Sequence, residues 1–87
     1  MGKLMNIGFG NVVNTDQVVA IVSMDAAPVK RMFQAAKEHG VLIDASCGRK
    51  TKSLILTSSD YSIASALTPE TLMQRFNADP AGGNADV

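Results

Sequence analysis

Short apolar runs separated by polar, glycine-containing turns mark the N-terminal part of the chain. The run from Leu4 to Phe9 predicts a first strand, which ends in the turn-forming sequence Gly8-Phe9-Gly10-Asn11. A second turn is predicted at Asn14-Thr15-Asp16. The segment that follows, Gln17 to Val22, is nearly all apolar and rich in β-branched residues, which predicts a buried strand.

A helical pattern comes next. Four apolar residues recur at the spacing i, i+3, i+4 and i+7, which places them on one face of a helix: Val29, Met32, Phe33 and Ala36. Ser23-Met24-Asp25 supplies helix-start chemistry, and Pro28 is acceptable in the first helical turn. Gly40 is placed to end the helix in a left-handed conformation.

The second half of the chain predicts three more strands and a second helix. The strands are expected at residues 41–46, 52–58 and 61–67, and the segment Cys47–Thr51 has the length of a hairpin connection between the first two. Thr68-Pro69-Glu70 is a helix start, so a helix is expected over 69–77.

These elements follow the order ββαβββα. They predict a small single domain of the α+β class, with a mainly antiparallel sheet and two helices. We expect this domain to occupy residues 1–77 and residues 78–87 to form a flexible C-terminal tail.

Composition changes this picture in one respect. Of the 87 residues, 46% are apolar and only 18% are charged. A domain of this size hides only about 60% of the surface of its unfolded chain. The sequence therefore predicts apolar surface outside the core, which association with further copies would cover, and it excludes disordered and low-complexity classes.

Charge is balanced in total and uneven in position. The net charge is zero, but residues 30–52 contain six basic and two acidic residues, whereas the rest of the chain contains two basic and six acidic ones. Arg49, Lys50 and Lys52 lie at or beside the tip of the predicted hairpin, where they could contact a phosphate backbone, and Lys30 and Arg31 lie on the first helix. Against this stands the ordinary interpretation that a charged turn is simply solvated.

The sequence offers little for catalysis or metal binding. His39 is the only histidine and Cys47 the only cysteine, which excludes an internal disulfide and a Cys-rich metal site. Gly48-Arg49-Lys50-Thr51 lacks the spacing of a phosphate-binding loop, and Gly8-Phe9-Gly10 lacks the third glycine of a dinucleotide fingerprint. We expect a protein that is not an enzyme, binds no cofactor or small-molecule substrate, does not enter membranes and resides in the cytoplasm.

Four segments together resemble the RemA family of small extracellular-matrix regulators of Gram-positive bacteria. They are Asn6–Asn11, Ala27–Met32, Gly40–Ala45 and Gly48–Thr51, and the resemblance extends in register from Asn6 to Arg75. It implies a bacterial transcriptional regulator that binds double-stranded DNA and activates matrix and osmoprotection genes. It also implies a ring-shaped homo-oligomer around which DNA wraps, and a fold related to the LytTR type of DNA-binding domain.

Residue by residue, the resemblance assigns the family's paired basic residues to Arg49 and Lys50, of which Lys50 stands where arginine is common. Pro28 matches a position that is important in the family, and Gly8, Gly10 and Gly48 are expected to have structural roles. The position of Gln17 is basic in the characterised regulators and neutral here. This departure and the zero net charge keep open an alternative, an oligomeric scaffold or interaction protein that binds no nucleic acid.

Overall fold

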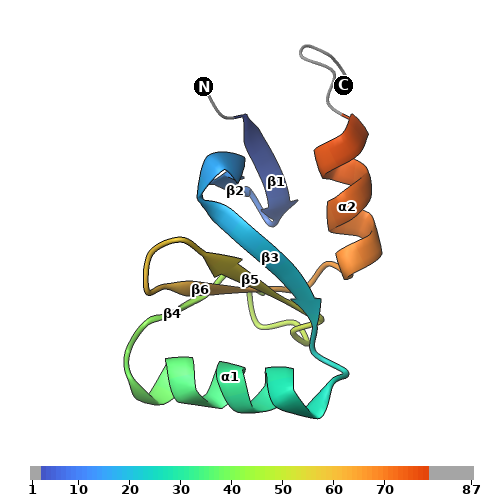
Figure 1. Cartoon of the computed structure of the whole chain (residues 1–87). Coiled ribbons are helices and arrows are strands. Elements are labelled where there is room, and N and C mark those ends of the chain that lie inside the picture. Colours follow the sequence, from blue (N-terminus) through green and yellow to red (C-terminus); the bar gives the residue numbers. More distant parts are fainter. Residues whose placement is uncertain (1–2, 79–87) are drawn as a thin grey trace.

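A computed structural model describes residues 3–78 as a small domain of the α+β class with two helices (Figure 1). The elements in chain order are β1 (Leu4–Gly8), β2 (Asn11–Asn14), the short 3₁₀ helix η1 (Thr15–Gln17), β3 (Val18–Ser23), α1 (Ala27–Glu38), β4 (Leu42–Asp44), β5 (Ser53–Thr57), β6 (Ser62–Ser65) and α2 (Pro69–Ala78). The fold class, the two helices and the mostly antiparallel pairing predicted from the sequence are confirmed. Of the predicted tail, Ala78 ends α2, and 79–87 lies outside the described residues.

The structure contains one strand more than the predicted order ββαβββα. Residues 11–14, which the sequence pattern left between two turns, form β2 and pair antiparallel with β1, so that Leu4 faces Asn14 and Met5 faces Val13. A four-residue strand with asparagine at both ends carries too little alternation to be recognised locally, and its pairing with β1 is what defines it.

The larger sheet has the strand order β3-β5-β6-β4. β3, β5 and β6 pair antiparallel, whereas β4 runs parallel to β6 at one edge. The prediction of a hairpin between the strands at 41–46 and 52–58 is therefore wrong, because β6 lies between β4 and β5. Length and turn residues indicated the connection, but they carry no information about which strands become neighbours.

The domain has three layers (Figure 1). α1 covers one face of the four-stranded sheet, and the β1–β2 hairpin and α2 lie on the other side, with α2 packed against β1 and β3. The main core lies between the four-stranded sheet and the layer formed by the β1–β2 hairpin and α2. It contains Met5, Ile7, Val13, Ala45, Ile55, Ile63 and Leu72. Because successive side chains of a strand point to opposite faces, the buried pair Leu54 and Ala64 lies on the face toward α1.

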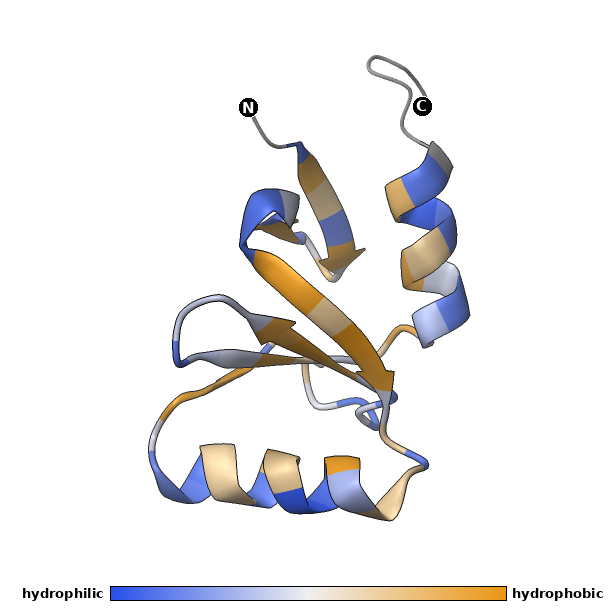
Figure 2. Cartoon of the chain, viewed as in Figure 1, coloured by the Kyte–Doolittle hydropathy of each residue, from blue (hydrophilic) through white to orange (hydrophobic). Residues whose placement is uncertain are grey.

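α1 forms over the predicted segment, but its start differs from the prediction. Its N-cap is Ala26, which makes no side-chain cap hydrogen bond, because the Ser23 hydroxyl accepts the amide of Asp25 in the turn before the helix. Pro28 lies in its first turn, and Gly40 follows its last turn with φ of 72°. Val29 and Ala36 are buried, whereas Met32, on the same predicted face, is 38% exposed. Figure 2 shows apolar residues on the side of α1 that faces the sheet and hydrophilic residues on the outer side. No helix within residues 3–78 has the length and apolar character needed to cross a membrane.

Candidate functional site

The basic segment between β4 and β5 is anchored at both ends. The amide of Ala45 donates to the carbonyl of Ala64 at 2.8 Å, and the amide of Lys52 donates to the carbonyl of Ser65 at 2.9 Å, so both ends are attached to β6 or its end. The carbonyl of Lys52 in turn accepts from the amide of Met24 at 3.1 Å, next to the end of β3. The backbone that carries Arg49 and Lys50 is therefore held in place by the sheet rather than by a hairpin turn.

Asp44 organises the first turn of this segment. Its Oδ1 accepts hydrogen bonds from the amide and the hydroxyl of Ser46. These bonds, with a smaller contribution from Lys37, hold the pKa of Asp44 below its ordinary value against the opposing effect of burial. The amide of Arg49 donates to the carbonyl of Ser46 at 3.0 Å, which continues the turn into the basic residues.

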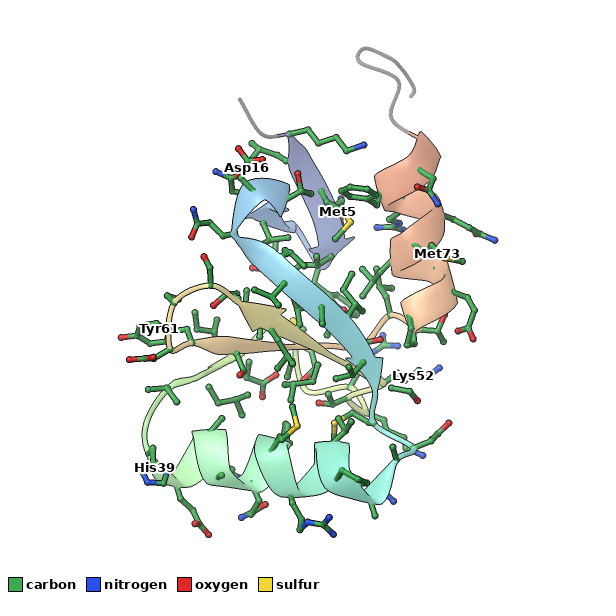
Figure 3. The ribbon with its side chains drawn as sticks, in the orientation of Figure 1. Met5, Asp16, His39, Lys52, Tyr61 and Met73 are labelled. Carbon is green, nitrogen blue, oxygen red and sulfur yellow. The ribbon has the colours of Figure 1, made fainter. Side chains whose placement is uncertain are left out.

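Three lysines from two elements meet at one hollow. Lys30 of α1 and Lys50 and Lys52 of the connecting segment line a cavity of about 380 Å³. Figure 3 shows Lys52 beside the C-terminal end of β3, between the starts of α1 and α2. The same hollow is lined by two carboxylates and by three hydroxyl-bearing residues, which are Asp25, Glu70, Ser23, Thr51 and Thr68. Its lining thus carries a net positive charge although the whole chain is neutral.

A second hollow, of about 360 Å³, adjoins the first because Lys50 and Lys52 line both. Its distinguishing residues are Arg49 and Phe9, and Ala66 and Leu67 form its apolar lining. The guanidinium of Arg49 lies 5.5 Å from the centroid of the Phe9 ring, within the range of a cation–π contact. Phe9 was not among the sequence-predicted site residues, although an aromatic residue between two turn glycines is a detectable signal for an exposed ring.

The remaining sequence-predicted site residues lie in different places. Arg31 is exposed on α1 but lines neither hollow, because consecutive helical residues point about 100° apart. Gln17 ends η1 at the opposite end of β3 from Lys52, and its side chain accepts a hydrogen bond from Ser58 at 2.7 Å. Pro28 is exposed. The three glycines expected to be structural, Gly8, Gly10 and Gly48, all have positive φ.

The two residues with the greatest catalytic potential occupy ordinary surroundings. The His39 ring nitrogen Nδ1 lies 2.8 Å from the carbonyl of Ala35 at the end of α1, and Cys47 is an exposed free thiol. Within residues 3–78, no three His, Cys, Asp or Glu side chains come together as a metal centre would require. The hollow lined by Lys30, Lys50 and Lys52 thus brings cations and hydroxyls together, which are groups that bind anions.

A third, apolar surface lies between β3 and α2. It is a groove of about 520 Å³ whose lining includes three strongly exposed apolar residues, Val19, Met73 and Phe76. Figure 3 shows Met73 on α2, and β3 is an edge strand of its sheet. Part of the exposed apolar surface therefore lies beside a strand edge. The prediction of a buried strand at 17–22 is wrong in this respect, because β3 is half-buried or exposed along its whole length.

Comparison with known proteins places these features in a family. The family described as RemA-like, Extracellular matrix regulatory protein A-like, matches residues 4–76. The chain is 55% identical to a protein of Alkaliphilus oremlandii over 87% of this chain and 82% of the relative, and 53% identical to one of Alkaliphilus metalliredigens over 98% and 91%. A protein of Acetivibrio thermocellus is 52% identical over 91% of this chain and 85% of its own length. All three carry the provisional name of regulatory protein, and the chain belongs to the RemA-like family.

Proposed function

We propose that the protein is an oligomeric transcriptional regulator that binds double-stranded DNA through its phosphate backbone. The observation that carries this proposal is the convergence of Lys30, Arg49, Lys50 and Lys52 on two adjoining hollows of a chain with no net charge. Lys50 and Lys52 are both exposed, which supports the proposal because their ammonium groups can reach a phosphate. The family to which the chain belongs supports a regulatory role.

Several copies of this site would be needed for useful affinity. Each phosphate that is neutralised contributes a slope of about −0.9 in log K against log salt, so two or three contacts bind weakly at physiological salt. In a ring, the same contacts are repeated in every protomer. Once one protomer holds the DNA, the contacts of the other protomers form within the same complex, which raises the affinity by about 100-fold or more. The apolar groove between β3 and α2 is the surface that supports self-association in this proposal.

The structure also offers an observation in favour of the alternative, an oligomeric scaffold without nucleic-acid binding. Asp25 and Glu70 line the same hollow as Lys30, Lys50 and Lys52, so the positive charge of the hollow is partly balanced within the chain. In a scaffold these charges would serve solubility or contacts between copies. The two functions differ in whether the purified protein binds a polyanion.

The direct test is retention on immobilised random duplex DNA at about 50 mM salt, followed by gel shift over a salt series. We expect the natural protein to bind and the double variant Arg49→Ala, Lys50→Ala to bind more weakly, with a salt slope reduced by about 1.8 for each protomer in contact. Arg31→Ala with Lys37→Ala is the matched control, because it removes the same charge from residues outside both hollows. Absence of retention, or equal losses in the two double variants, would contradict the proposal.

A further inference from the structure

Phe9 occupies a position that neither the core nor the turn requires of an aromatic residue. It lies in the turn between β1 and β2 with φ of 55°. This is the left-handed region, which residues other than glycine adopt only at a cost in free energy. Its neighbours Gly8 and Gly10 also have positive φ. The ring is 49% exposed, so burial does not offset the cost of this conformation.

The turn that carries Phe9 is held firmly. The amide of Gly8 donates to Oδ1 of Asn6 at 2.7 Å, and Nδ2 of Asn11 donates to the carbonyl of Gly8 at 3.0 Å. A Cβ atom at Gly8 would lie 3.5 Å from the side chain of Leu67, so the turn also lies close to the segment after β6. Phe9 is thus an apolar side chain whose backbone is held by hydrogen bonds and whose ring is accessible to solvent.

Three cations line the same hollow as this ring. Arg49 lies over it at 5.5 Å, and Lys50 and Lys52 share its hollow of about 360 Å³. An apolar partner protein would gain little from burying three cations, whereas DNA offers phosphates for the cations and base faces for the ring. The combination of an apolar wedge with arginine and lysine is the one that proteins use to enter and kink a duplex.

We infer that Phe9 inserts at a deformable base step of duplex DNA, with Arg49 beside it, and so makes binding sensitive to sequence. This inference rests on the proposed function, because it assumes that Arg49, Lys50 and Lys52 hold the DNA backbone. Pyrimidine–purine steps such as TA unstack most readily, so they are the steps at which the ring would enter. Sequence preference then arises without hydrogen bonds to base edges.

The test uses the full chain and short duplexes that carry the fluorescent base 2-aminopurine either at a central TA step or within an A-tract. We expect the natural protein to raise the fluorescence at the TA step only, because unstacking removes quenching, and to bind the TA duplex about fivefold or more tightly than the A-tract duplex. Phe9→Ala abolishes the fluorescence rise and the preference but keeps the salt slope. Phe9→Leu, which keeps an apolar wedge, retains part of both.

Phe9→Gly serves as the folding control, because glycine adopts the left-handed conformation without steric strain, so this variant should melt at or above the temperature of Phe9→Ala. Loss of the fluorescence rise in both variants is then due to the missing ring rather than to strain in the turn. Equal fluorescence from the natural protein and Phe9→Ala overturns the inference while the proposed function stands. A lower solution mass of Phe9→Ala also overturns it, since Phe9 would then be a contact between copies, and so does tighter binding of single-stranded DNA than of either duplex. If the natural protein binds no DNA, it is the proposed function that fails.

Discussion

Nη1 of Arg75 in α2 donates to both oxygens of Asn6 in β1, at 3.1 Å to the side-chain Oδ1 and 3.3 Å to the carbonyl. The same Oδ1 accepts the amide of Gly8 at the start of the turn between β1 and β2. One guanidinium therefore ties the second helix to the N-terminal hairpin. Arg75, one of the two basic residues outside the segment 30–52, is committed to a contact within the chain.

Replacing Arg75 with alanine should loosen this connection. We expect Arg75→Ala to lower the free energy of unfolding by about 1 kcal/mol or less, because exposed charged contacts contribute little. In a domain of this size that corresponds to a fall of about 4–8 °C in melting temperature at most. Gln74→Ala is the control, since Gln74 is an exposed neighbour on the same helix. Equal melting temperatures of the two variants would show that the Arg75–Asn6 contact has no stabilising effect.

Lys30 and Arg31 are adjacent on α1 but should differ in their contribution to DNA binding. Lys30 lines the first hollow and Arg31 does not. We expect Lys30→Ala to reduce the salt slope of binding by about 0.9 for each protomer in contact, and Arg31→Ala to leave it nearly unchanged. Both variants remove one positive charge, so a gel-shift salt series separates position from total charge. A larger effect of Arg31→Ala would place the contact surface on the outer face of α1.

The groove between β3 and α2 should determine the oligomeric state. Val19 lines it and is 69% exposed, so Val19→Glu would bring a charge into an apolar contact between copies. We expect this variant to have a lower solution mass by light scattering than the natural protein. Val12→Glu is the matched control, because Val12 is 56% exposed on β2 and does not line the groove. If both variants keep the mass of the natural protein, copies do not associate through this groove.

Pro28, in the first turn of α1, should stabilise the folded protein by reducing the conformational entropy of the unfolded chain. Proline restricts the unfolded chain and fits this turn, so Pro28→Ser should lower the free energy of unfolding by about 0.4–1 kcal/mol. The measurement is the melting temperature, with Ala27→Ser as a control for placing serine in the same turn. Pro28 is exposed, and we also expect the change to loosen a contact between copies, so the solution mass is measured together with the melting temperature. A melting temperature equal to that of the natural protein would remove this role from Pro28.

Asp44 should make stability depend on acid pH. Its pKa is lowered in the folded protein by the hydrogen bonds from Ser46, so its contribution is complete above the unfolded pKa of about 4 and is lost as the pH falls through the folded value. We expect Asp44→Asn to melt below the natural protein at pH 7 and the difference to shrink between about pH 5 and pH 3. The measurement is the melting temperature of both proteins at a series of pH values from about 7 to 3. A difference that stays constant with pH would mean that the Asp44 charge is not responsible.

Local features of the structure follow from the sequence by itself. The spacing of Val29, Met32, Phe33 and Ala36 predicts α1, and Gly40 and Pro69 mark a helix end and a helix start where the structure has them. These signals act between residues a few positions apart, through periodic burial, fixed φ angles and hydrogen bonds at helix ends. The α+β class follows because the same signals separate helices from strands.

The neighbours of each strand were decided by the tertiary structure. The sequence shows that residues 42–44 and 53–57 are extended, but β6, which follows both in the chain, lies between them. The contact of Phe9 with Arg49 and the meeting of Lys30 with Lys50 and Lys52 depend on that arrangement. Pairing and packing are set by the burial of all apolar faces at once, so residues distant in the chain meet only when the whole core has assembled.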